Sequence, residues 1–315
     1  MNADRTFAAL LAIALLALSL PAVLAARVVP IALAPSGGVH RLSGAAGFLG
    51  PGCSWLLETV PGGAMTVALA AVGLLVASLA AGGSTAARQW RGERRLVAAI
   101  EAMRRPPPPA LRRQLRRLGL QGRVDVIAAP RPVAFTYGWR TPRICLSRAL
   151  LRLLPPDALE AVLRHERHHL RRRDPLRLAL VRTLAAGAFL VPALRDVHAH
   201  SLTLLELAAD ADAIAPPHGR GPLARALYAF VRSWHREGAP PGRSPAGPGG
   251  APLWTLLTGP GGTVVAFGPQ PQAVLNARID CLLDPQRRPA VMWSPVRLAT
   301  TGGVLAAALC LLLLL

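Results

Sequence analysis

The sequence RHERHHLRRRD, Arg164 to Asp174, places three histidines and one glutamate among a run of arginines. Its residues His165 to His169 fit the pattern HExxH. On a helix, side chains four residues apart share one face, so His165 and His169 can present two imidazole rings to one metal ion. Glu166 would reach the open side of that ion. The spacing therefore predicts a metal site with a carboxylate base beside it.

A catalytic zinc site needs a third protein ligand and one open position. The segment LLELAADADA, Leu204 to Ala213, offers Glu206 and Asp210, one helical turn apart. We expect Glu206 to be the third ligand and Asp210 to hold a ligand histidine by its other ring nitrogen. Zinc lowers the pKa of its water towards ~7, so that Glu166 can take the proton and pass it to a leaving amine. One Zn²⁺ per chain is expected.

The predicted helix around the motif begins near Pro155, because apolar residues recur at helical spacing from Leu159 onward. Asp157 is expected to cap it, with Glu160 completing a capping box. Upstream, Arg123–Ala129 predicts one strand, and 132–147 predicts two strands around a turn at Gly138. An edge of that hairpin is expected to hold an extended substrate backbone. Further helices are predicted over 176–194, 201–214, 221–237 and 272–284.

Three uncharged stretches, about 6–26, 64–82 and 298–315, are long enough to cross a bilayer. Arginines follow the second directly and are dense from Ala87 to Arg173, so the positive-inside rule places the region after it in the cytoplasm. A cleaved signal peptide is the alternative interpretation of the first stretch. The helix 176–194 is not expected to cross, because Glu206 would then lie on the opposite side from His165. The sequence leaves open whether that helix lies on the membrane.

The predicted fold class is a mainly α membrane protein with about three transmembrane helices and a cytoplasmic α+β zincin-like metallopeptidase domain containing a small β-hairpin or sheet. The predicted domains are an N-terminal transmembrane hairpin (1–83), the peptidase domain (84–295) and a C-terminal transmembrane helix (296–315). A Pro/Gly-rich linker is expected at 239–252. The chain is thus expected to be a multi-pass protein of the cell membrane.

Four motifs occur in order between Val124 and Leu283: PVAFTYGWRTPRICLSRALL, DALEAVLRHERHHLRRRDPLR, LLELAADADAI and LNARIDCLL. Together they resemble the BlaR/MecR family of membrane-embedded antirepressor metallopeptidases. The resemblance implies a gluzincin-type zinc endopeptidase facing the cytoplasm, with His165, His169 and Glu206 as ligands and Glu166 as base. It also implies a protein substrate, such as a winged-helix repressor.

One feature departs from that family. Its full-length antibiotic receptors continue into an extracellular penicillin-binding sensor, whereas this sequence stops at Leu315 and contains no lysine. A Ser-x-x-Lys acylation site is therefore absent from it, and we expect a short form that does not itself sense β-lactams.

Other functions remain open at this stage. A membrane quality-control protease of the HtpX type would use the same chemistry on misfolded proteins. A non-enzymatic scaffold or sensor could bind zinc structurally, although such a site needs no base like Glu166. The formal net charge of +20 raises the question of nucleic-acid binding. Few aromatic residues accompany the arginines, so contact with lipid headgroups is expected instead, with no direct nucleic-acid partner. The oligomeric state is not indicated.

Overall fold

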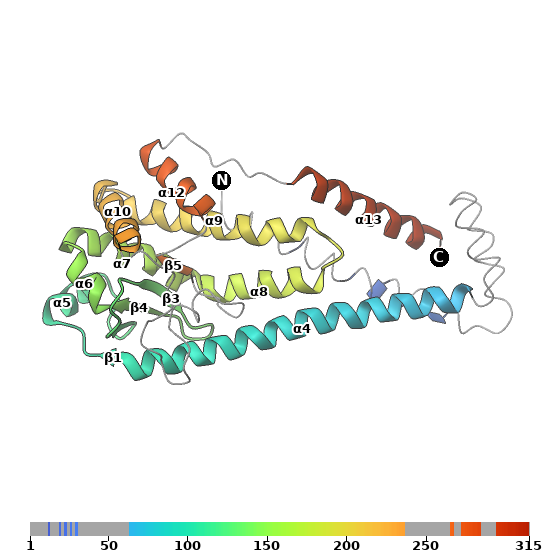
Figure 1. The fold of residues 1–315 in the computed structure, drawn as a ribbon, viewed down its shortest axis with the longest axis horizontal. Helices are drawn as coiled ribbons and strands as arrows, with labels where there is room; N and C mark the ends of the chain where they lie inside the picture. Colours follow the sequence, from blue (N-terminus) through green and yellow to red (C-terminus); the bar gives the residue numbers. More distant parts are fainter. Residues whose placement is uncertain are drawn as a thin grey trace. The chain divides into compact units, whose positions relative to one another are not determined.

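The computed structural model describes residues 63–236, 265–267, 272–284 and 294–314, with seven isolated positions between 12 and 30. The elements named in Figure 1 are α4 (Gly63–Met103), β1 (Arg104–Arg105), α5 (Pro109–Arg117), β2 (Val124–Ile127), β3 (Ala134–Tyr137), β4 (Arg143–Ser147), α6 (Arg148–Leu153), α7 (Pro156–Arg172), α8 (Asp174–Gly187), α9 (Ala193–Ile214), α10 (Gly221–Arg236), β5 (Val265–Phe267), α12 (Gln272–Leu283) and α13 (Pro295–Leu314). This is a mostly helical chain with one small mixed sheet.

The described chain divides into two compact units. One comprises Met1–Thr85, Val181–His198 and Met292–Leu315, and the other comprises Ala86–Leu180 and Ala199–Val291. All of the predicted site residues lie in the second unit, which also contains the sheet. The fold of that unit is therefore what positions the site.

The sheet has the strand order β1-β2-β4-β3-β5. Strands β2 and β4 are parallel, and the other neighbouring pairs are antiparallel. The predicted hairpin around Gly138 is confirmed, with Thr136 opposite Ile144 in the register. The expectation that this hairpin supplies a substrate-binding edge is wrong for the described state. Strand β5 pairs along β3 and β2 pairs along β4, so β1 and β5 are the outer strands.

Apolar side chains cover both faces of the sheet. On one face, Val126 and Leu146 pack in a cluster with residues of α5, α6, α7 and α10. On the other, Phe135 and Cys145 pack against Leu96 and other residues of α4. Because both faces are covered, the central strands are almost entirely buried, as expected for near-continuous apolar runs.

Helix α7 carries the HExxH motif, and its two ends are well defined. It begins at Pro156 without a side-chain cap, so the predicted capping box at Asp157 is wrong. The reason is that proline already has the φ angle of a first helical residue and needs no amide partner there. The helix ends at Arg172. The next residue, Arg173, caps it with a left-handed φ of 55°, and its N–H donates to the carbonyls of His169 and Leu170. The chain therefore turns sharply at Asp174, directly after the motif.

The boundary between the next two helices differs from the prediction. Instead of helices over 176–194 and 201–214, the chain forms α8, ending at Gly187, and α9, beginning at Ala193. Pro192 explains the shift, because proline cannot donate a helical hydrogen bond and is tolerated only near a helix start. The two helices predicted over 221–237 and 272–284 are confirmed within one residue.

Among the described residues, one helix is long and apolar enough to cross a membrane, namely Leu69–Met103 with a hydropathy of 1.7. It contains most of the predicted span 64–82. The predicted span 6–26 and the predicted linker 239–252 fall mainly outside the described residues. Helix α13 covers most of the predicted span 298–315, and its crossing of a membrane stays a prediction.

Candidate metal centre

Helices α7 and α9 bring three predicted ligands together. The Nε2 atoms of His165 and His169 lie 3.1 Å apart. Glu206 Oε2 lies 3.4 Å from His165 Nε2, and Glu206 Oε1 lies 3.8 Å from His169 Nε2. All three side chains are fully buried. One ligand atom from each residue lies within 4.8 Å of the others, which makes the cluster compatible with a single metal ion.

Carboxylates hold the outward nitrogens of both histidines. Nδ1 of His165 lies 2.8 Å from Asp210, and Nδ1 of His169 lies 2.8 Å from Asp174. An ionised carboxylate can only accept, so the proton of each neutral ring belongs on Nδ1. When both rings are neutral, their Nε2 lone pairs point into the same small space, where one metal ion can accept both. A tetrahedral zinc ion requires its ligand atoms to be roughly 3.3 Å apart, so this donor set fits zinc.

Glu206 gives a second reason for this fit. Its Oε1 atom is buried and has no hydrogen-bond partner among the described residues. Leaving a buried carboxylate oxygen unsatisfied is costly, and a metal ion would satisfy it. Burial opposes ionisation of Glu206, but the charge of Arg278 and the contacts with His165 outweigh it and lower the pKa to about 2. The carboxylate is therefore charged at neutral pH, as a zinc ligand must be.

Arg278 on α12 joins the two acids of α9. Its Nε and one terminal nitrogen donate to Asp210 at 2.8 and 2.7 Å. The other terminal nitrogen lies 2.8 Å from Glu206 Oε2. The side chain is fully buried, so the cost of desolvating its charge is offset by these two carboxylates. Arg278 thus fixes the relative positions of Asp210 and Glu206.

Glu166 lies next to the ligand cluster and is held from β3. The hydroxyl of Thr136 lies 2.7 Å from Glu166 Oε2 and 3.2 Å from the Glu166 carbonyl oxygen. The Oε1 atom has no hydrogen-bond partner among the described residues and is buried. Burial raises the pKa of Glu166, although the two histidines and Thr136 oppose the increase. A raised pKa suits a group that takes up a proton and then releases it.

Three contributors were missed in the sequence. Thr136 lies in the predicted hairpin and Arg278 in the motif LNARIDCLL, but the sequence did not assign either of them, or Asp174, a role in the site. The signal for Asp174 was its place directly after the motif helix. The motif LNARIDCLL, which contains one arginine in an otherwise mostly apolar segment, was the signal for Arg278. The third histidine of the motif, His168, is not part of the ligand cluster, and its Nδ1 lies 3.6 Å from Asp212.

The match to a known protein family covers the hairpin, α7 and α9 but not Arg278 on α12. Residues 110–238 match the model of Peptidase family M48. The match spans the hairpin, α7 and Glu206, and together with the His165, His169 and Glu206 cluster it supports a metallopeptidase function. Peptidases of this family are typically zinc-dependent. The searches of curated proteins and of solved structures found no match. The likeness to the BlaR/MecR antirepressors therefore remains a resemblance of motifs.

Proposed function

We propose that the chain is a membrane-anchored, zinc-dependent endopeptidase that hydrolyses peptide bonds of a cytoplasmic or membrane-proximal protein. The observation that carries the proposal is the pair of histidine Nε2 atoms, which lie 3.1 Å apart. The buried carboxylate of Glu206 completes a set of three possible metal ligands, and the buried Glu166 lies next to that set. The match to Peptidase family M48 over residues 110–238 supports the same chemistry.

His165, His169 and Glu206 would hold the zinc ion. The chemistry that zinc supplies when bound is polarisation of the scissile carbonyl and activation of water. Asp210 and Asp174 keep the two rings in the required tautomer, because each holds an Nδ1 proton. Arg278 keeps Glu206 in place from the other side. The ligands are thus oriented before any metal or substrate arrives.

Glu166 would act as the general base and then as the general acid. It takes a proton from the attacking water, whose oxygen forms the new bond to the scissile carbon. It then delivers that proton to the amine nitrogen as the peptide bond breaks. Its free Oε1 is available for this transfer, while Thr136 holds Oε2. Water and peptide are consumed, and one carboxylate and one amine are formed.

The membrane location is supported by α4. Its apolar part continues into a segment with Arg88, Arg91, Arg94 and Arg95. Arginines directly after a span favour a cytoplasmic location for the region that follows, so the peptidase would face the cytoplasm. A substrate would then be a cytoplasmic protein or the cytoplasmic part of a membrane protein.

Two roles are compatible with that location. In regulated proteolysis the substrate would be one specific regulator, such as a winged-helix repressor, as the motif resemblance implies. In quality control of the HtpX type the substrates would be many misfolded membrane proteins. A non-catalytic zinc scaffold is the remaining alternative.

The test compares new protein N-termini in cells that express the wild-type chain, Glu166→Gln or Glu160→Gln at equal levels. Glu160 is a matched control, because it lies on the same helix but pairs with Arg164 instead of facing the metal cluster. One or a few termini lost only with Glu166→Gln would support regulated proteolysis, and many lost termini would support quality control. Identical profiles from all three chains, with zinc bound in each, would leave the scaffold as the function.

A further inference from the structure

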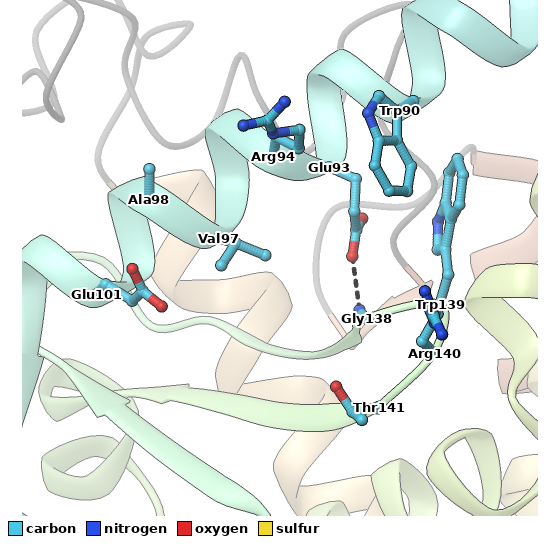
Figure 2. Close-up of a pocket in the computed structure, with 10 residues that line it drawn as sticks. All are labelled: Trp90, Glu93, Arg94, Val97, Ala98, Glu101, Gly138, Trp139, Arg140 and Thr141. Carbon is cyan, nitrogen blue, oxygen red and sulfur yellow. Dashed lines mark hydrogen bonds between the residues drawn. The ribbon is translucent and has the colours of Figure 1, made fainter.

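A pocket lies between the C-terminal half of α4 and the turn that joins β3 to β4 (Figure 2). Its volume is about 310 Å³, and both walls belong to the same compact unit. Helix α4 forms one wall, and residues 138–141 form the other. No residue of the candidate metal centre lines it, so the peptidase chemistry does not account for this pocket.

One end of the pocket carries two tryptophans, one from each wall. The ring centroids of Trp90 and Trp139 are 5.9 Å apart, and the ring planes are tilted by 56°. Trp90 is 49% exposed, so a large part of its ring is available to a partner at this end of the pocket. Tryptophan is enriched at the level of lipid headgroups, because its ring is amphipathic.

Two arginines near this end have no partner in the described part of the protein. Arg94 and Arg140 are exposed, and neither has an ion-pair or hydrogen-bond partner among the described residues. Glu93, in contrast, is buried, and its Oε1 accepts a hydrogen bond from the Gly138 N–H at 2.7 Å (Figure 2). The other acid, Glu101, lies seven residues beyond Arg94, about 10 Å further along the helix. The end with the tryptophans therefore carries two arginines without a partner in the described chain, and Glu93 adds one negative charge whose Oε1 already accepts from Gly138.

The tryptophan end of the pocket follows the apolar part of α4. That part carries no charged residue before Arg88, and Trp90 comes two residues later. Arginine and tryptophan directly after a span are typical of the membrane–water interface. Arg94 lies four residues beyond Trp90, about 6 Å further along the helix. One wall of the pocket thus begins just beyond the apolar part of α4.

We propose that this pocket binds the phosphodiester headgroup of an anionic phospholipid. Arg94 and Arg140 contact the phosphate, and the two tryptophans contact the glycerol region and the first carbons of the acyl chains. An anionic lipid fits better than a zwitterionic one, because the protein leaves two guanidinium groups uncompensated. Free phosphate shares the same charge chemistry but would make no use of Trp90 and Trp139.

The site has a direct structural link to the catalytic residues. The Gly138 amide that Glu93 holds is two residues from Thr136, which contacts Glu166. Headgroup binding itself does not depend on the proposed peptidase activity, so it can be measured in a Glu166→Gln background.

The experiment measures phospholipid binding to the full-length, detergent-solubilised Glu166→Gln chain by native mass spectrometry. The probes are phosphatidylglycerol and phosphatidylcholine with identical acyl chains. The test variant is Arg94→Gln with Arg140→Gln. Its matched control is Arg91→Gln with Arg95→Gln, which removes the same charge from neighbouring exposed positions of α4 that do not line the pocket.

An arginine near an anionic headgroup contributes a factor of about five in affinity, so the test variant should bind phosphatidylglycerol roughly 30-fold more weakly. The control should retain most of its affinity, Trp90→Ala should weaken binding as well, and phosphatidylcholine should bind weakly to every chain. Equal losses in the test and control variants would show unspecific attraction and overturn the proposal. Displacement of the lipid by millimolar inorganic phosphate would also overturn it, in favour of a free-phosphate site.

Discussion

The hydroxyl of Thr136 donates to Oε2 of Glu166 across 2.7 Å, which joins β3 to the helix that carries the metal-binding histidines. Both side chains are fully buried, so no water can replace this contact. The carboxylate therefore has one oxygen fixed by the sheet and one oxygen free for proton transfer.

The first prediction follows from this contact. Thr136→Val keeps the volume of the side chain but removes the hydroxyl, and kcat should fall about 10–100-fold, as for other residues that orient catalytic groups. KM and zinc content should change little, because Thr136 is not one of the three candidate ligands and its hydroxyl contacts Glu166. Thr136→Ser should restore most of kcat. Equal kcat values for the valine and serine variants would show that the hydroxyl at position 136 does not contribute to catalysis.

The second prediction concerns Arg278. Arg278→Met should lower the free energy of unfolding by about 3–5 kcal/mol, because Asp210 and Glu206 would keep their buried charges without a partner. Denaturant unfolding in detergent measures this change. The matched control is Arg225→Met, since Arg225 pairs with the exposed Asp157 and its loss should have no measurable effect. Similar stabilities of the two variants would mean that the buried network contributes little.

The contrast between His169 and Arg278 shows what the sequence can predict. Two histidines four residues apart on a helix face the same way whatever surrounds them, so local spacing is sufficient to pair them. The regular apolar pattern placed α7 and the β3–β4 hairpin for the same reason. Arg278 and β5 reach their partners through tertiary packing alone, and nothing near them in the sequence specifies which strand or carboxylate they meet.

Metal removal gives the third prediction. Chelation should abolish hydrolysis and lower the melting temperature, because zinc binds only the folded arrangement of His165, His169 and Glu206. Added zinc at 100 times its Kd should restore about 2.7 kcal/mol of stability. Glu206→Gln provides the control, since its stability should respond far less to zinc. If added zinc did not change the melting temperature of the wild-type chain, a metal ion at this cluster would be excluded.

The fourth prediction concerns acid stability. Burial tends to raise the pKa of Asp125, but hydrogen bonds from Arg143 and Tyr137 and the charges of Arg143 and Arg104 outweigh it and lower the pKa below 3.8. A lowered pKa means that the ionised form stabilises the fold above pH 3.8, and that this stabilisation is lost as the pH falls through the folded-state value. Asp125→Asn should therefore be clearly less stable than wild type at pH 7.

The measurement is the difference in unfolding free energy between wild type and Asp125→Asn across pH 7 to 2. That difference should be constant down to about pH 4 and then shrink towards zero as the wild-type carboxyl is protonated. A difference that stays constant down to pH 2 would show that the charge of Asp125 contributes nothing. In that case the ion pair between Arg104 of β1 and Asp125 of β2 would also contribute nothing to the stability of the fold.

The last prediction uses Gly138, where the turn between β3 and β4 meets Glu93. Its φ is +93°, and a Cβ atom added there would lie 2.6 Å from the carbonyl oxygen of Thr141. Gly138→Ala should therefore cost more than the 1–3 kcal/mol typical of a strained backbone position, because the turn must also move. Gly119→Ala is the matched control, with φ of +69° and no atom within 4 Å of the added Cβ. If the turn moves, it displaces both the Glu93 contact and Thr136, so Gly138→Ala should also lower kcat while Gly119→Ala should not. Equal losses of stability in both variants would show that the close contact with Thr141 adds no cost, and an unchanged kcat of Gly138→Ala would show that the turn does not position Glu166.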